Sequence, residues 1–146
     1  MASVEMIEEE TVTGKVKEIY DDIKESLGID FVPNMYKTMA RNPSYLEASW
    51  NKISAVMGEQ HQLDDLTKAI IALTVSTMNG CGYCIEVYTS AVLKYGLDDD
   101  GLTEVAAVID VFNGLNKFNT GLGVEMDEKP WYGCGGTGAL NAVGTN

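Results

Sequence analysis

Positive charge, histidine and long apolar runs are scarce in this chain of 146 residues. It carries 10 Lys and Arg against 22 Asp and Glu, a net charge of −12, and the basic residues form no cluster. Such an acidic surface repels phosphate backbones, which excludes nucleic acid as an expected partner. We recognise no apolar run long enough to cross a bilayer and no charged-then-apolar leader segment. We therefore expect a cytoplasmic protein without a membrane partner.

Cysteine and histidine are too few and too scattered for a closed metal site. The chain has three cysteines and one histidine. Cys81 and Cys84 form a Cys-x-x-Cys pair, but Cys134 lies in a glycine-rich stretch and His61 in a polar connection. A structural zinc site commonly needs four such ligands brought together. We expect no metal and no resident cofactor.

Proline is also rare, and its placement leaves most of the chain open to helix. The three prolines, Pro33, Pro43 and Pro130, stand where a helix could begin or outside the helices. Gly28 follows one helical stretch as a C-cap candidate, and Asp64 suits the dipole at the start of another. Hydrophobic spacing is helical elsewhere, which predicts an all-α bundle of about six helices. The helices are expected within residues 13–28, 32–43, 43–58, 63–80, 81–96 and 98–123.

Several of these helices have apolar faces that we expect to be buried. The stretch 70–75 is apolar nearly all round, so its helix should be covered on most sides. Residues 1–126 are expected to form one helical domain, and the glycine-rich residues 127–146 a tail without periodicity. The side chains expected to point inward are Leu46, Trp50, Ile53, Val56 and Met57 in the third helix and Val105, Val108, Ile109, Phe112, Leu115 and Phe118 in the last.

The segment NGCGYCIEVY, residues 79–88, concentrates the reactive groups. Two long helical stretches meet here as an antiparallel pair joined near Gly80. The spacing lets the sulfurs of Cys81 and Cys84 approach within one helical turn, close enough for a disulfide. Free N–H groups at the helix start should lower the pKa of Cys81, which favours a redox dithiol. The alternative is two buried cysteines that pack as small hydrophobes.

The segment LTVSTMNGCGYCIEVYTSAVLKYGL resembles the core motif of the carboxymuconolactone decarboxylase / alkylhydroperoxidase D-like family, in its peroxidase-related branch. The flanking segments fit as well, so that the resemblance covers roughly residues 10 to 126. It implies an all-helical subunit that associates through helix faces into homotrimers or homohexamers. It also implies a dithiol that reduces hydroperoxides or passes electrons between thiol proteins, recycled by an external thiol of lipoyl or thioredoxin type.

The resemblance further implies a role for each sulfur. Cys84 would attack the peroxide, and Cys81 would then close the disulfide. A proton relay of one Glu and one His normally serves the pair, but those positions hold Ala69 and Tyr88. The position between the cysteines, which can also hold a His in the family, is Tyr83.

Tyr88 and Glu86 are the remaining candidates for proton transfer. Tyr88 is four residues after Cys84 and so on the same helix face, where it could donate a proton but would be a poor base. Core packing is the alternative role for this phenol. Glu86 lies about 200 degrees round the helix from Cys84 and is expected to face away, as a solvated or intersubunit charge.

Four functions follow from these features. The leading one is a thiol-dependent antioxidant enzyme of the alkylhydroperoxidase or peroxiredoxin type, which reduces hydroperoxides through Cys81 and Cys84. The second is a redox adaptor or protein disulfide reductase with little peroxidase activity, favoured by Ala69 and Tyr88. Lactone decarboxylation, the third, needs no dithiol, so the intact pair counts against it. The fourth is a helical oligomer with structural cysteines.

Overall fold

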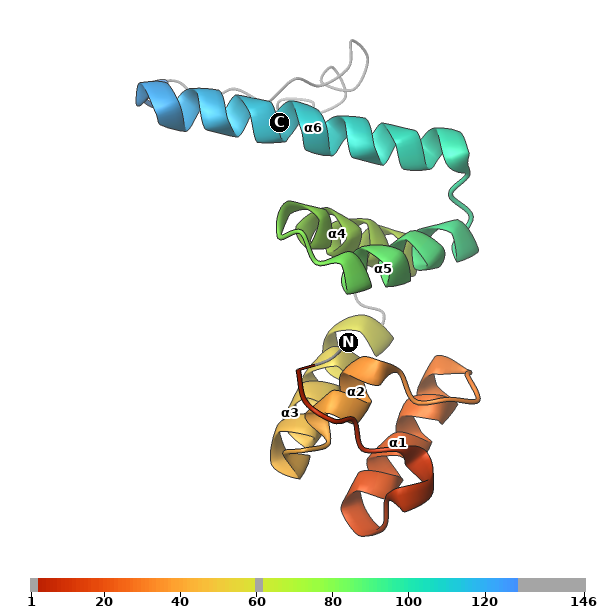
Figure 1. Cartoon of the computed structure of the whole chain (residues 1–146). Helices are drawn as coiled ribbons and strands as arrows, with labels where there is room; N and C mark the ends of the chain where they lie inside the picture. The colour runs from red at the N-terminus through yellow and green to blue at the C-terminus, as the bar shows by residue number, and fades with distance from the viewer. Residues whose placement is uncertain (1–2, 60–61, 129–146) are drawn as a thin grey trace, which may run out of the picture. The chain divides into compact units, whose positions relative to one another are not determined.

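The computed structural model describes residues 3–59 and 62–128. His61, Cys134 and nearly all of the predicted tail lie outside the described residues, so the domain boundary at residue 126 stays a prediction. Every regular element in the described ranges is helical, which confirms the all-α expectation (Figure 1). The six α-helices are α1 (Gly14–Leu27), α2 (Asn34–Met39), α3 (Pro43–Ile53), α4 (Asp65–Met78), α5 (Gly82–Lys94) and α6 (Asp99–Leu122), with a 3-10 turn η1 (Glu9–Thr11) and a π-helical turn η2 (Ser54–Gly58).

The helix ends are set by the residues that the sequence marks. Gly28 takes φ 64°, a left-handed conformation that costs glycine little, and its N–H bonds the carbonyl of Glu25 to end α1. The Asn42 side chain caps α3, and the Asp64 carboxylate accepts the N–H of Thr67 at 2.7 Å to cap α4. The predicted helix stop at Gly28 and the predicted start near Asp64 are therefore confirmed.

Helices α1, α2 and α3 enclose one apolar core. The phenol of Tyr20 donates to the carbonyl of Ile7 at 2.9 Å, and the Trp50 indole donates to Asp22 at 2.5 Å, so the buried polar tips are satisfied. Each large side chain buried here contributes roughly 1.5–3 kcal/mol relative to its exposure. The core members are Ile19, Tyr20, Ile23, Val32, Tyr36, Ala40, Leu46 and Trp50.

The π-helical turn η2 changes the helix phase after α3. A π turn holds more residues than an α turn, so side chains beyond Ile53 leave the face predicted from regular spacing. Val56 was expected to point inward and is 57% exposed, so that prediction is wrong. Met57, its neighbour, remains partly covered.

Helices α4 and α5 form the predicted antiparallel pair around Gly80, and they lie side by side in Figure 1. Gly80 turns the chain with φ 67°, and the N–H of Cys81 bonds the carbonyl of Ser76 at 3.0 Å. This tight connection returns the chain along α4 and starts α5 directly beside the end of α4. The prediction of a hairpin at this glycine is confirmed.

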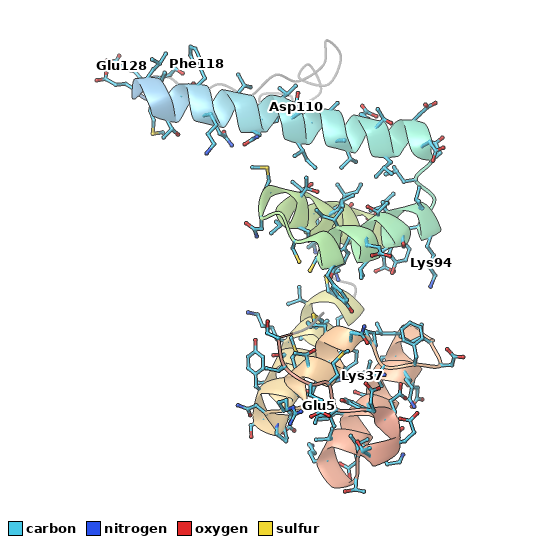
Figure 2. The ribbon with its side chains drawn as sticks, in the orientation of Figure 1. Glu5, Lys37, Lys94, Asp110, Phe118 and Glu128 are labelled. Atoms are coloured by element: carbon cyan, nitrogen blue, oxygen red, sulfur yellow. The ribbon has the colours of Figure 1, made fainter. Side chains whose placement is uncertain are left out.

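Two apolar faces that were expected to be buried remain exposed in the single chain. Ile71 and Val75 of α4 are about half exposed, although the helix was expected to be covered on most sides. Phe118 of α6, labelled in Figure 2, is 61% exposed. Spacing identifies an apolar face but not the surface that covers it, so the burial expected for these faces stays a prediction. The other exposed side chains of α6 that were expected inward are Val108, Phe112 and Leu115.

The described residues divide into two compact units between Leu102 and Thr103, and the cysteine pair lies in the first. Within the described ranges, no helix combines the length and apolar character that a bilayer crossing requires.

Candidate dithiol site

The two cysteines of the described chain stand at the start of α5, as predicted. Cys81 is the N-cap residue, with extended backbone angles (φ −82°, ψ 90°), and Cys84 is the third residue of the helix. The carbonyl of Cys81 accepts the N–H of Ile85 at 2.9 Å and so begins the helical hydrogen-bond ladder. Both side chains are free thiols, partly covered from solvent.

Negative charge is favoured on the sulfur of Cys81. Its pKa is lowered, first because the Cys84 thiol donates a hydrogen bond to it, and then because the backbone N–H groups of Cys84 and Tyr83 point toward it. The sequence predicted a lowered Cys81 pKa from the position of this residue at the helix start alone. In the structure the neighbouring thiol of Cys84 is the larger cause of that lowering.

Cys84 keeps its proton when the pair first ionises. Its pKa is raised because its thiol donates to Cys81, because it is partly buried, and because charge on Cys81 opposes a second charge. A hydrogen bond with the hydroxyl of Ser76 acts in the opposite direction and favours the thiolate. The monoanion of the pair therefore holds its charge at Cys81 and its proton at Cys84.

A cleft of about 810 Å³ lies beside Cys84 within the first unit. Residues from α1, α2, α3, η2, α4 and α5 form its walls, and most are apolar or aromatic. Of the candidate site residues, Cys84 and Tyr88 line the cleft, whereas Cys81 and Glu86 do not. The aromatic residues of the wall are Tyr36, Trp50, Tyr83, Tyr88 and Tyr95.

Tyr88 is placed to act as a proton donor rather than as a base. It is half-buried, and burial raises its pKa, followed by the nearby Cys84 and Tyr95. Tyr36 faces the same cleft, where burial first and then Tyr88 and Tyr83 raise its pKa to about 12. Both phenols thus hold their protons at neutral pH.

The remaining predicted positions do not bring acid–base groups to the cysteines. Glu86 is exposed on α5, and its backbone carbonyl accepts the hydroxyl of Ser90 at 3.1 Å. Ala69, where the relay glutamate was expected, is 1% exposed and presents only a methyl group to the cleft. Beside it, Lys68 is buried and donates to the carbonyl of Glu59.

Sequence reasoning missed Ser76 and Tyr36. Ser76 is buried at 8% exposure; its carbonyl accepts the N–H of Cys81, its hydroxyl donates to the carbonyl of Ala72, and its nearness acts to lower the pKa of Cys84. The sequence held no specific signal for Ser76, because Thr74 and Thr77 beside it also carry hydroxyls. Tyr36 belongs to a distant helix, and no local pattern could place it at the cleft.

A model of the carboxymuconolactone decarboxylase family matches residues 43–124, which is more than half of the chain. The chain belongs to the carboxymuconolactone decarboxylase family. The matched range runs from the start of α3 beyond the end of α6 and includes the dithiol.

Solved and curated relatives agree with this assignment. The crystal structure of the alkylhydroperoxidase AhpD core from Rhodospirillum rubrum is similar with a TM-score of 0.83 and 34% identity, covering 88% of this chain and 96% of that one. Alkyl hydroperoxide reductase AhpD of Coxiella burnetii is 35% identical over 46 residues, 32% of this chain and 26% of that protein.

A relative with a different printed activity also matches. An (R)-2-haloacid dehalogenase of Pseudomonas putida is 29% identical over 114 residues, 75% of this chain and 36% of that protein. The chain therefore spans only about a quarter to a third of the length of the curated relatives that it matches.

Proposed function

We propose that this chain reduces hydroperoxides through a dithiol–disulfide cycle of Cys81 and Cys84, as an oxidoreductase of the alkylhydroperoxidase type. The observation that carries the proposal is the position of Cys84, a free thiol that lines an apolar cleft and interacts with the thiol of Cys81. An apolar wall suits the organic part of a hydroperoxide, and a second thiol in contact supplies the resolving group. The likeness to the AhpD proteins supports the same reaction class.

The pair can activate the attacking sulfur without an external base. Because Cys84 already donates to the Cys81 thiolate, transfer of that proton produces a thiolate at Cys84. This thiolate attacks the terminal peroxide oxygen, so that an S–O bond forms and the O–O bond breaks. The alkoxide takes the proton of Tyr88, which solvent restores. Cys84 is left as a sulfenic acid.

Resolution returns the charge to Cys81. The Cys81 thiol then loses its proton, because the backbone N–H groups of Cys84 and Tyr83 still act to lower its pKa, and its thiolate attacks the sulfur of the sulfenic acid. The disulfide bond forms, and the sulfenic oxygen leaves as water with the released proton. One hydroperoxide and the dithiol thus yield one alcohol, one water and the disulfide. An external dithiol, of lipoyl or thioredoxin type, restores the pair with two electrons.

A redox adaptor or protein disulfide reductase is the second candidate, and one observation favours it. The relay positions hold the methyl of Ala69 and the phenol of Tyr88, so no carboxylate or imidazole stands there to move protons. Thiol–disulfide exchange expels a thiolate, which is a far better leaving group than an alkoxide and needs no proton donor. Thiol–disulfide exchange would therefore tolerate Ala69 and Tyr88 at the two relay positions.

Stoichiometric oxidation separates the two functions. The reduced protein is mixed with one equivalent of an organic hydroperoxide, and intact mass and free thiol content are followed with time. The peroxidase function predicts loss of two hydrogens with formation of one equivalent of alcohol. Oxidation by a disulfide-bonded protein or by oxidised lipoamide, without oxidation by any peroxide, would instead establish the adaptor.

We also propose that copies of this chain cover the exposed apolar faces of α4 and α6, in a homotrimer or homohexamer. The side chains of Ile71, Val75 and Phe118 are each about half exposed or more in the single chain. Exposed apolar side chains gathered on one helix face mark an interaction site more often than a solvated surface.

A further inference from the structure

We propose that the cleft beside Cys84 takes organic hydroperoxides that carry a carboxylate, and that the ammonium of Lys68 and the hydroxyl of Ser54 bind this carboxylate. The inference rests on the proposed function for the peroxide end of the ligand, which would meet Cys84, but not for the carboxylate end. It names a substrate class, an apolar acid hydroperoxide, in place of hydrogen peroxide or an uncharged alkyl hydroperoxide.

Lys68 is a buried cation in a wall that is mostly apolar or aromatic. It is 9% exposed and lines the cleft from the first turn of α4. Its ammonium, which has three donors, donates to the neutral backbone carbonyl of Glu59. Ion pairs among the described residues are made by other cations, namely Lys15, Lys17, Lys24, Lys37 and Arg41. Burial of an ammonium is costly unless an opposite charge and hydrogen bonds compensate for it, and a bound carboxylate would supply both.

Ser54 provides a second polar group in the wall of the same cleft. Its buried hydroxyl oxygen has no hydrogen-bond partner, and it is the one side-chain atom of this kind in the described ranges. A buried hydroxyl that stays unpaired destabilises a fold, so its retention in a cleft wall indicates a ligand or a water as its partner. The hydroxyl can donate to a carboxylate oxygen.

The π-helical turn η2 brings these two groups to one region of the cleft. Ser54 is its first residue, and Glu59, whose carbonyl accepts the bond from Lys68, directly follows its last residue. The hydroxyl and the ammonium are therefore held at opposite ends of a single helical turn. Isolated π turns are frequent at functional sites. A carboxylate has two acceptor oxygens, one for each donor.

The carboxylate site and the dithiol are separate parts of the cleft. Lys68 is not among the groups that shift the pKa of Cys81 or Cys84, so its charge does not serve the sulfurs. The cleft volume of about 810 Å³ suits an organic ligand rather than hydrogen peroxide. A ligand that meets Cys84 with its hydroperoxide and Lys68 with its carboxylate needs an apolar body between the two groups, which the aromatic wall would contact.

The charge of the chain makes Lys68 decisive for an anionic ligand. The net charge of −12 opposes binding of any anion. Among the described residues that line the cleft, Lys68 is the one cation and Asp65 the one carboxylate. Asp65 lies three residues earlier on α4, where its charge opposes the ligand. Loss of the Lys68 charge should therefore weaken carboxylate binding, and loss of the Asp65 charge should strengthen it.

The test compares two probes that differ in one charge, cumene hydroperoxide with a para carboxylate and its methyl ester. The corresponding alcohols, which cannot oxidise a thiol, are titrated into the full chain by calorimetry. The wild-type protein should bind the acid roughly tenfold to hundredfold more tightly than the ester. Lys68→Met should lose this preference and Asp65→Asn should increase it. Lys52→Met makes the same change of charge on an exposed residue of α3 outside the cleft lining and should retain the preference.

Ser54→Ala keeps the test decisive should Lys68→Met unfold. The variant should bind the acid alcohol about tenfold more weakly, yet it should melt at the same or a higher temperature, because an unpaired buried hydroxyl is removed. A merely structural hydroxyl would not combine these two changes. Ser90→Ala is the control, since the hydroxyl of Ser90 bonds the carbonyl of Glu86 at 3.1 Å and lies outside the cleft lining.

Equal binding of the acid and ester alcohols by the wild-type protein would overturn the proposal, as would equal losses in Lys68→Met and Lys52→Met. Stopped-flow oxidation with the two hydroperoxides then tests the peroxide end. If the acid alcohol binds through Lys68 while neither hydroperoxide oxidises Cys84, the carboxylate site is supported and the proposed function fails. If Lys68→Met slows reduction of the disulfide by dihydrolipoate but not oxidation by the acid hydroperoxide, the site serves a reductant, and the substrate class proposed is wrong.

Discussion

The interaction between the Cys81 and Cys84 side chains lowers the pKa of Cys81 and raises that of Cys84, so the partner in the cleft wall holds the proton and the helix-cap partner holds the charge. This order follows from position. Cys81 precedes the first turn of α5 and meets its free N–H groups, whereas Cys84 faces the cleft. In the resting pair the sulfur of Cys84, which faces the cleft, therefore ionises less readily than the sulfur of Cys81.

Removal of the Cys84 thiol should weaken the thiolate of Cys81. In Cys84→Ala the main cause of the lowered Cys81 pKa is lost, so the pKa should rise and alkylation of Cys81 near neutral pH should slow. Cys84→Ser retains a hydroxyl donor and should slow it less. Iodoacetamide labelling with peptide mass spectrometry from about pH 6 to about pH 10, a range that spans the ordinary thiol pKa, measures this. Equal rates in the two variants would show that the hydrogen bond is unimportant.

Tyr88→Phe should slow peroxide reduction while it leaves alkylation of the cysteines nearly unchanged. The ring still packs in the cleft, but the proton for the alkoxide is gone, and proton transfer typically contributes on the order of 10²–10⁴-fold. Tyr95→Phe is the control, because Tyr95 also lines the cleft but lies farther along the chain from Cys84. Stopped-flow rates that fall equally in both variants would indicate a packing effect.

Restoration of the expected relay should increase turnover. Tyr88→His places an imidazole one turn from Cys84, and Ala69→Glu places a carboxylate in the buried cleft wall beside Lys68. The double variant should gain roughly tenfold or more in rate, with some loss of thermal stability because a charged group is buried. If the double variant folds and keeps its oligomeric state but shows no gain in turnover, the natural residues Ala69 and Tyr88 do not limit peroxide reduction.

The protein should sediment as a trimer or a multiple of a trimer at micromolar concentration. Phe118→Glu, together with Phe112→Glu, puts charge on the exposed face of α6 and should dissociate the assembly with helicity retained. Glu104→Gln, on the same helix, is the control. Analytical ultracentrifugation that finds a monomeric wild-type protein would contradict the proposed assembly.

The parts of the fold that depend on local chemistry could be predicted from the sequence. Gly28, Asp64 and Gly80 act through their own backbone or nearest neighbours, and each marks the helix end or turn that was expected. Val56 was mispredicted because the π turn changes the helix phase, which regular spacing does not reveal. The faces of α4 and α6 were recognised as apolar, but burial depends on a partner surface.

The candidate site could be predicted along α5 but not across helices. Cys81, Cys84 and Tyr88 lie along one helix and its N-cap, so the number of residues between them determines their relative positions. Ser76 and Tyr36 reach the site from α4 and α2 through tertiary packing. Helix α4 also carries the hydroxyls of Thr67, Thr74 and Thr77, so the sequence does not single out Ser76.

Sulfenic acid trapping in the two single-cysteine variants tests the central claim most directly. The reduced Cys81→Ser and Cys84→Ser proteins are treated with an organic hydroperoxide and a dimedone-type trap, and the adducts are quantified by mass spectrometry. We predict that Cys84, alone in the first variant, forms the adduct and that Cys81, alone in the second, reacts slowly. Faster trapping at Cys81 would show that the helix-cap thiolate is the nucleophile, and no trapping at either sulfur would contradict peroxide reduction by this dithiol.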